Sequence, residues 1–211
     1  MTQTARFVAL AISTLVITAI PAPATANLIV NGSFELPGGG GILATGSTFF
    51  EGWVVTRDNI EVIGGCSDEA WCLDLDGSNF GGIAQSFSTV PGLQYRVTFE
   101  LSGNPARYSP TEPLEKILGV SAAGSGTSFV FEVTPPLEGS PHDWVAHEWF
   151  FAATDLETTI EFFSLDSLEL GHSGLFGPAL DNVAVVPVPE PRTAVLVALG
   201  ATLLALIRRR R

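Results

Sequence analysis

Histidines, a serine and acidic side chains are the residues of this chain whose types could support catalysis. His142-Asp-Trp-Val-Ala-His147-Glu148 lacks the order and spacing of H-E-x-x-H, so it does not predict a zinc-binding helix. Gly171-His-Ser173-Gly-Leu175 comes close to the nucleophile elbow of serine hydrolases, but Leu175 stands where that motif has glycine. We predict that the protein is not an enzyme. A secreted hydrolase that acts on glycans through an unrecognised acidic site is the alternative, because 22 acids always offer candidate carboxylate pairs.

The two cysteines lie close together in sequence, at Cys66 and Cys72. Nearby cysteines usually pair in an oxidising compartment, to which the N-terminal segment described below directs the chain. A zinc site would need further Cys or His ligands close in sequence, and a redox pair favours the spacing C-x-x-C. We therefore predict a structural disulfide between Cys66 and Cys72.

Two further groups of side chains could bind a ligand. Sugar rings pack their apolar faces on aromatic planes, and the candidate stacking residues are Trp71, Tyr108, Trp144 and Trp149. Burial of these rings in a core would argue against that role. Asp76-Gly77-Ser78-Asn79 resembles a fragment of a calcium loop, but the rest of an EF-hand is missing, so we interpret it as a hairpin turn.

The elements that position these side chains are almost entirely strands. Apolar residues alternate with polar ones, or form short runs, between Gly, Pro, Asn and Asp. In one such segment Tyr95 and Phe99 share a face while Arg96 and Glu100 share the other. Many short strands with regular turns predict one all-β domain, an antiparallel β-sandwich of the jelly-roll type. The predicted strands are Leu28–Val30, Trp53–Thr56, Ile60–Ile63, Cys72–Leu75, Gly82–Phe87, Gln94–Ser102, Lys116–Ala122, Thr127–Val133, Trp144–Ala152, Thr158–Ser164 and Ala179–Val185.

Short motifs follow one another in a fixed order along this domain. They are Asn27-Leu-Ile-Val-Asn31-Gly32-Ser33-Phe34-Glu35, Gly52-Trp53, Leu73-Asp-Leu-Asp-Gly77, Gly82-Ile-Ala-Gln85-Ser-Phe87, Gly92-Leu-Gln-Tyr95-Arg-Val-Thr-Phe99 and Leu180-Asp181-Asn182-Val183. Together they resemble the choice-of-anchor C domain, which is related to a plant cell-wall domain of unknown function. The resemblance spans residues 27–186 and implies a galactose-binding-like jelly roll whose relatives carry interchangeable surface-sorting signals.

This resemblance also implies a role for Glu35 and Asp181. In the carbohydrate-binding jelly rolls that the sequence resembles, the first and last of these motifs meet. A carboxylate from each then holds a structural calcium together with backbone carbonyls. Calcium takes about six to eight oxygen ligands, which two carboxylates, carbonyls and water would supply. Two solvated carboxylates at the sheet ends are the alternative.

Residues 1–26 have the features of a secretory signal peptide. Arg6 supplies the positive charge, residues 7–20 form the apolar stretch, and Ala24-Thr25-Ala26 is a small-x-small cleavage site. An uncleaved anchor helix is the alternative. We expect export through the inner membrane and a mature protein that begins at Asn27.

The last 25 residues, 187–211, form a second targeting segment. A proline-rich motif ending in Pro189-Glu190-Pro191 precedes an uncharged apolar run, residues 193–207, and the cluster Arg208, Arg209, Arg210 and Arg211. As a helix this run spans about 22 Å, short of a ~30 Å hydrocarbon core, but flanking arginines can snorkel to the interface. We predict one short transmembrane helix that the arginines stop on the cytoplasmic side.

The motif, the span and the basic end together resemble the PEP-CTERM sorting signal. That resemblance covers these 25 residues and implies an exosortase, a membrane-embedded cysteine transpeptidase-like enzyme, as the partner that cleaves near the motif. Residues 187–211 are then a sorting signal, and the function of the mature protein lies in residues 27–186.

Charge limits the partners of this domain. Six of the ten cations and one of the 22 acids lie in the two ends, which leaves 21 acids against four bases, a net charge of −17. Such a surface repels nucleic acid and anionic lipid. We expect a non-catalytic protein of the cell surface, extracellular matrix or biofilm matrix that engages exopolysaccharide. A purely structural envelope protein without a ligand is a further alternative.

Overall fold

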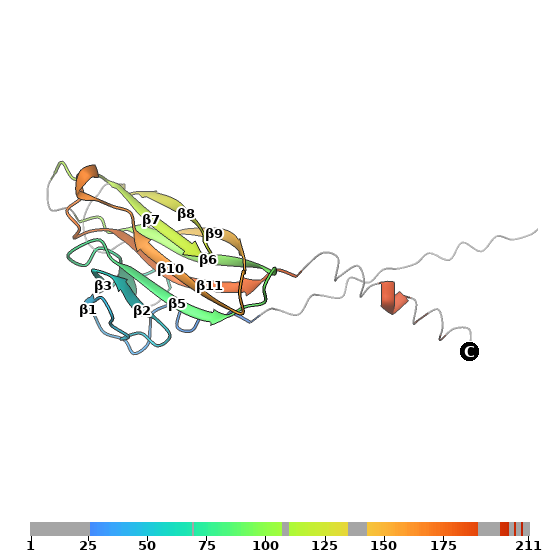
Figure 1. The fold of residues 1–211 in the computed structure, drawn as a ribbon. Coiled ribbons are helices and arrows are strands. Elements are labelled where there is room, and N and C mark those ends of the chain that lie inside the picture. Colours follow the sequence, from blue (N-terminus) through green and yellow to red (C-terminus); the bar gives the residue numbers. More distant parts are fainter. Residues whose placement is uncertain are drawn as a thin grey trace, which may run out of the picture.

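The computed structural model describes residues 26–68, 70–106, 110–134 and 143–189, together with residues 199–202, 205 and 208. Among the described residues up to 189, the chain forms eleven strands and one short 3-10 helix, η1 (Figure 1). Their bounds are β1 Gly41–Ala44, β2 Val54–Arg57, β3 Asn59–Ile63, β4 Cys72–Asp74, β5 Gly82–Ser88, β6 Gln94–Gly103, β7 Glu115–Ala122, β8 Ser125–Glu132, β9 Val145–Ala152, β10 Glu157–Ser164, η1 Leu168–Leu170 and β11 Pro178–Pro187.

The strands form two sheets, and every strand pairing within them is antiparallel. One sheet has the order β1-β3-β4-β11-β6-β9 and the other has the order β2-β5-β10-β7-β8. Side chains from both sheets meet in one core, where the ring centroids of Phe99 on β6 and Phe162 on β10 are 5.3 Å apart. The prediction of an all-β antiparallel sandwich is confirmed.

Alternation along β6 shows how the sequence specifies the core. Tyr95 and Phe99 are buried between the sheets, whereas Arg96 is exposed and Glu100 is half-buried on the outer face. This is the pattern that period-two spacing predicts, since successive side chains point to opposite faces of a strand. Ten of the eleven predicted strands are present, with ends shifted by no more than two residues.

One predicted strand is wrong. Leu28–Val30 lies against the sandwich but has no ladder partner, because a side chain replaces the neighbouring strand. The Val30 N–H donates to Gln85 Oε1 at 2.7 Å, and Gln85 Nε2 donates to the Val30 carbonyl at 2.9 Å. Conversely, β1 follows a run of glycines that gave no strand signal, and it forms through its pairing with β3.

Both ends of the sandwich domain leave from the same end of the molecule (Figure 1). The Leu28 N–H donates to the Val185 carbonyl at 2.9 Å, and Asn27 Oδ1 accepts from the Val185 N–H at 2.9 Å. The loops β4–β5, β6–β7 and β10–β11 lie at the opposite end, which we call the loop end.

The predicted targeting segments fall mainly outside the described residues. This holds for residues 1–25, for Glu190 and Pro191, and for Arg209, Arg210 and Arg211. Residues 199–202, 205 and 208 are helical, and none of the helical residues described forms a helix long and apolar enough to span a bilayer. The signal peptide, the sorting motif and the transmembrane helix therefore stay predictions.

Replacing Gln85 with Leu should detach residues 28–31 from the sandwich. The partly buried Val30 N–H would lose its acceptor and the Val30 carbonyl its donor, and we expect a loss of about 1 kcal/mol of unfolding free energy. Denaturant unfolding of the purified protein measures this loss, with Ser88→Ala on the exposed face of β5 as the control. Equal stability of the two variants would show that Gln85 does not hold this segment.

Candidate functional site

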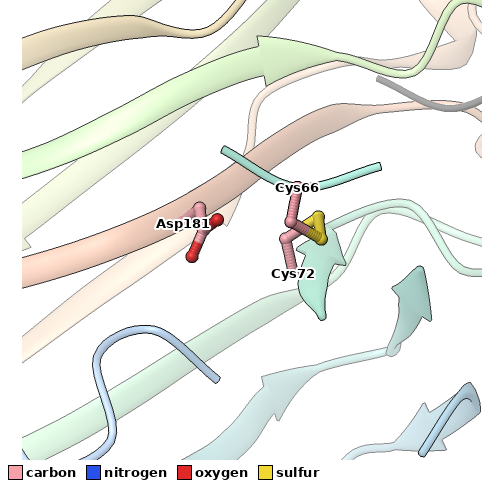
Figure 2. A group of neighbouring side chains, drawn as sticks. All are labelled: Cys66, Cys72 and Asp181. Carbon is pink, nitrogen blue, oxygen red and sulfur yellow. A yellow bond between two sulfur atoms is a disulfide. The ribbon is translucent and has the colours of Figure 1, made fainter. Parts of the chain in front are cut away.

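The outer face of the six-stranded sheet carries a row of residues in register across β11, β6 and the edge strand β9. Asp181 on β11 pairs with Glu100 on β6, and Glu100 pairs with Ala146 on β9. Next to Asp181 lies the disulfide between Cys66 and Cys72, which closes a loop over this face and confirms the predicted pairing (Figure 2). The loop covers the outer face beside Asp181. The outer face of β6 and β9 beyond Glu100 stays uncovered, and we call it the open part.

Cys66, Cys72 and Asp181 have potential ligand atoms within 4.8 Å of one another, as metal ligands would (Figure 2). Both sulfurs are bonded to each other, so neither is available as the thiolate that binds a metal. This group is therefore a disulfide packed against a carboxylate, and it does not form a metal site.

Ser67, Glu100, Asp181 and Asn182 form a hydrogen-bonded group that we call the Ser67 cluster. The Ser67 N–H and hydroxyl both contact Asp181 Oδ2 at 3.1 Å, and the hydroxyl also bonds to Glu100 Oε2. Asn182 Nδ2 donates to Ser67 Oγ and to Glu100 Oε2, each at 2.9 Å. Burial raises the pKa of Asp181 to about 6, although the N–H groups of Ser67 and Asn182 act in the other direction.

A bulge in β11 brings Asp181 and Asn182 to the same cluster. The register with β6 shifts between Asp181 and Ala184, and Asn182 has a positive φ of 50°. In a regular strand two consecutive side chains would point to opposite faces, and the bulge removes that restriction.

Glu35 holds the other end of the disulfide loop. Its Oε1 atom accepts the backbone N–H groups of Ala70 at 2.9 Å and Trp71 at 2.7 Å. Carboxylates from residues far apart in sequence, Glu35 and Asp181, thus bind opposite ends of one short loop. Calcium at these two residues stays a prediction, and the hydrogen bonds give both carboxylates a role in holding the loop.

The four candidate stacking residues lie in different environments. The Trp71 indole is half-buried against the backbone of Gly40, and the half-buried Trp144 donates its indole N–H to the Gly65 carbonyl at 3.2 Å. These two rings flank the disulfide loop. Trp149 packs on the core side of β9, with its ring centroid 5.7 Å from that of Phe151. Tyr108 lies outside the described residues.

The open part of the outer face carries an aromatic ring that the sequence analysis missed. Phe150 is 41% exposed and pairs with Arg96 across β9 and β6. The next pair on this face joins Glu148 to Thr98, and Glu100 follows. The alternation of Trp149 and Phe151 toward the core was the sequence signal that could have identified Phe150 as an outward-facing residue.

The catalytic motifs considered above are not assembled in the described residues. The Ser173 hydroxyl donates to Glu112 Oε1 at 2.7 Å, and the buried His172 bonds through Nε2 to the Glu115 carbonyl at 2.9 Å. The half-buried His147 ring stacks on Phe99, and burial lowers its pKa. His142 lies outside the described residues.

A second group of acids, also missed from the sequence, is buried at the loop end. Burial raises the pKa of Asp74 to about 7, that of Asp76 to about 8 and that of Asp166 to about 6. None of these three side chains belongs to a residue more than 3% exposed. A polymeric substrate therefore has no access to them in this structure.

Comparison with known proteins gives a family match and structural neighbours. The family model described as "Protein of unknown function (DUF642)" matches residues 27–186. No curated protein matches the chain in sequence.

Three solved structures illustrate the structural neighbours. TmCBM61 in complex with beta-1,4-galactotriose has a TM-score of 0.46 and 16% identity, over 78% of this chain and 100% of that one. A family 35 carbohydrate binding module from Clostridium thermocellum has a TM-score of 0.44 and 12% identity, over 68% and 96%. Arabinose-bound MgGH51 α-L-arabinofuranosidase has a TM-score of 0.48 and 14% identity, over 77% and 26%.

Asp181→Ala should loosen the disulfide loop. The Ser67 N–H would lose its acceptor, and we expect a loss of about 1–3 kcal/mol of unfolding free energy. Amide hydrogen exchange of residues 66–72, measured by mass spectrometry in EDTA, should accelerate.

Glu148→Ala is the matched control, because Glu148 is exposed on the same face. It should change the unfolding free energy by less than about 0.5 kcal/mol. Unchanged exchange of the loop in Asp181→Ala would contradict the role assigned to this carboxylate.

Proposed function

This chain belongs to the DUF642 family, and on that premise we propose that it is an exported, non-catalytic surface protein whose sandwich binds a polysaccharide. The family description states no function. The proposal therefore rests on the chemistry of the outer face of the six-stranded sheet and on the position of the chain ends.

The observation that carries the proposal is the open face of β6 and β9. An exposed ring, Phe150, stands beside the guanidinium-bearing Arg96 and near Thr98 and Glu148. A sugar presents an apolar ring face and several hydroxyl groups, so it suits one aromatic plane surrounded by hydrogen-bonding side chains. The face is open and built on strands, which leaves room for an extended chain.

Residues at the edge of this face would orient the ligand. Glu100 joins the open face to the Ser67 cluster, and Trp144 lies beside the disulfide loop at the same edge. Carboxylate and amide groups can accept and donate hydrogen bonds to hydroxyls. We assign Phe150 and Trp144 as stacking residues and Arg96, Glu100 and Glu148 as hydrogen-bonding residues.

Binding explains the acid distribution better than hydrolysis does. Hydrolysis of a glycoside needs two carboxyl groups beside the scissile bond. The acids with strongly raised pKa values, Asp74 and Asp76, are fully buried instead. We propose a binding protein that is not an enzyme, and we propose exopolysaccharide as its ligand because a domain of net charge −17 favours a neutral or cationic polymer over an anionic one.

The export and sorting functions are also part of the proposal. Residues 1–26 direct export, residues 27–186 form a choice-of-anchor C-like domain, and residues 187–211 are a PEP-CTERM signal for an exosortase. Asn27 and Val185 lie together at one end of the sandwich, so a membrane span that follows Pro189 would hold the loop end away from the bilayer. The processed protein then stays in the envelope, on the cell surface or in the biofilm matrix.

Phe150→Ala should weaken polysaccharide binding about tenfold, because a stacked ring and its buried area contribute on the order of 1.4 kcal/mol. A glycan array probed with the purified protein identifies the ligand, and titration of wild type and variant with that glycan measures the loss.

Val130→Ala is the control, because Val130 is exposed on β8 of the other sheet. It should bind like wild type. Absence of any glycan ligand, or equal affinity of Phe150→Ala and wild type, would refute binding at this face.

Replacement of Pro189, Glu190 and Pro191 by alanine should leave the protein in the inner membrane at uncleaved mass. Deletion of Arg208 to Arg211 should have the same result, because both parts define the sorting signal. Cell fractionation and intact mass measurement follow the outcome. Processing like that of wild type in both variants would leave an ordinary C-terminal anchor and remove the exosortase.

A further inference from the structure

The buried acids at the loop end come from two segments of the chain that are far apart in sequence. Asp74 lies in β4, Asp76 lies in the turn between β4 and β5, and Asp166 follows β10. Their residues are 0%, 0% and 3% exposed, respectively. A buried carboxylate must find hydrogen-bond donors, a cation or a proton, because desolvation of the free anion is costly.

Asp74 has donors. Its Oδ1 accepts the N–H groups of Asp76 at 2.8 Å and Gly177 at 3.0 Å, and its Oδ2 accepts from Asn104 Nδ2 at 2.8 Å. These bonds tie the β4–β5, β6–β7 and β10–β11 connections to one carboxylate. Asp74 is thus oriented firmly at the centre of the group.

Asp76 is less well supplied. Neither of its carboxylate oxygens meets the geometry of a hydrogen bond, although the nearby Ser164 hydroxyl favours its ionised form. Oδ2 of Asp166 also has no hydrogen-bond partner, whereas Asp166 Oδ1 accepts the Ile117 N–H at 2.8 Å. Gly177 packs directly against Asp76, since a Cβ on residue 177 would come within 2.4 Å of Asp76 Cγ, so no larger side chain fits there. The side chain is therefore held in a site that its own hydrogen bonds do not explain.

The cations nearby do not balance these acids. Lys116 is 1% exposed, and its ammonium group donates to the Phe176 carbonyl while it stabilises the ionised forms of Asp74, Asp76 and Asp166. His172 lies with Nε2 3.6 Å from Asp166 Oδ1. One lysine against three carboxylates leaves an excess of buried negative charge.

We propose that this group is a calcium site, with Asp76 as the main ligand and Asp74 and Asp166 supplying further oxygens. The free donors are all carboxylate oxygens, which suit calcium and do not suit zinc, for which nitrogen and sulfur ligands are typical. Calcium accepts irregular geometry and about six to eight ligands, so backbone carbonyls and water can complete its shell.

Ion binding requires a small movement of side chains. Among the described residues, the trio of candidate ligands whose atoms lie within 4.8 Å of one another is Cys66, Cys72 and Asp181. Asp76 and Asp166 must therefore turn toward Asp74 to share one ion. Because neither Asp76 oxygen has a hydrogen bond of good geometry, rotation of the carboxylate would loosen only its contact with the Ser164 hydroxyl.

The site is separate from the calcium predicted at Glu35 and Asp181 and from the proposed glycan face. It would join β4, β10 and the loop that precedes β11 at the loop end. Its chemistry requires only the folded protein and free calcium, so it can be tested without any glycan.

The test is calcium titration of the purified full chain after dialysis against EDTA, followed by calorimetry and thermal unfolding. We expect wild type to bind calcium and to unfold about 5 °C higher when calcium is in large excess over Kd. Asp76→Asn should bind at least tenfold more weakly at this site. It should be as stable as wild type without calcium, because the change removes an unpartnered buried charge and keeps the shape.

Two controls separate this site from other effects. Asp181→Asn should retain the calcium bound at the loop end, and magnesium at equal ionic strength should stabilise wild type much less, because it prefers a tight octahedron. The proposal is overturned if wild type binds no calcium, if magnesium stabilises as well as calcium, or if Asp76→Asn binds calcium as wild type does. The last two results would leave Asp76 as a protonated carboxyl group.

Discussion

Burial of carboxylates is the constraint on which the loops of this sandwich depend. The core between the sheets forms from alternating apolar side chains, and the strands that carry them satisfy their backbone groups through the ladders of the two sheets. The connections are different, because their backbone groups require partners wherever they are covered. Glu35, Asp74 and Asp181 supply acceptors to such groups, and each binds segments distant in sequence. An acidic composition that suggests solubility alone is therefore also part of the fold.

The sequence predicts the core better than the connections. Period-two spacing located β6 and β10 and gave the correct inward faces, because a half-buried strand must alternate. The spacing wrongly predicted a strand at residues 28–30, where the side-chain amide of Gln85 bonds to Val30 in place of a neighbouring strand. It also missed β1, because the glycines before this strand give no alternating pattern. Both failures arise from contacts between residues far apart in sequence, which local patterns do not record.

The same limit explains what the sequence revealed about the candidate site. The Cys66–Cys72 pair was predictable from short spacing and a predicted export signal, and family resemblance drew attention to Glu35 and Asp181. Neither source could show that both carboxylates bind the disulfide loop, since the bulge at Asn182 decides which side chains reach it. The predicted stacking residues differ in environment, and the role in stacking stays a prediction. Trp149 turns inward, and its neighbour Phe150 turns outward for the same geometric reason.

The two ends of the sandwich are held together by different interactions. At one end Asn27 and Val185 are joined by hydrogen bonds, so force on the tail, if it is anchored as proposed, would act on β11 beside β6, in the centre of a sheet. At the other end, the first residues of β11 follow Gly177, whose N–H is bound by Asp74 and whose backbone contacts Asp76. A cation at Asp76 would therefore strengthen the end of β11 opposite to the end from which the proposed anchor would pull. β11 itself would link the proposed anchor to the loop end, and it also contributes Asp181 to the disulfide loop beside the proposed glycan face.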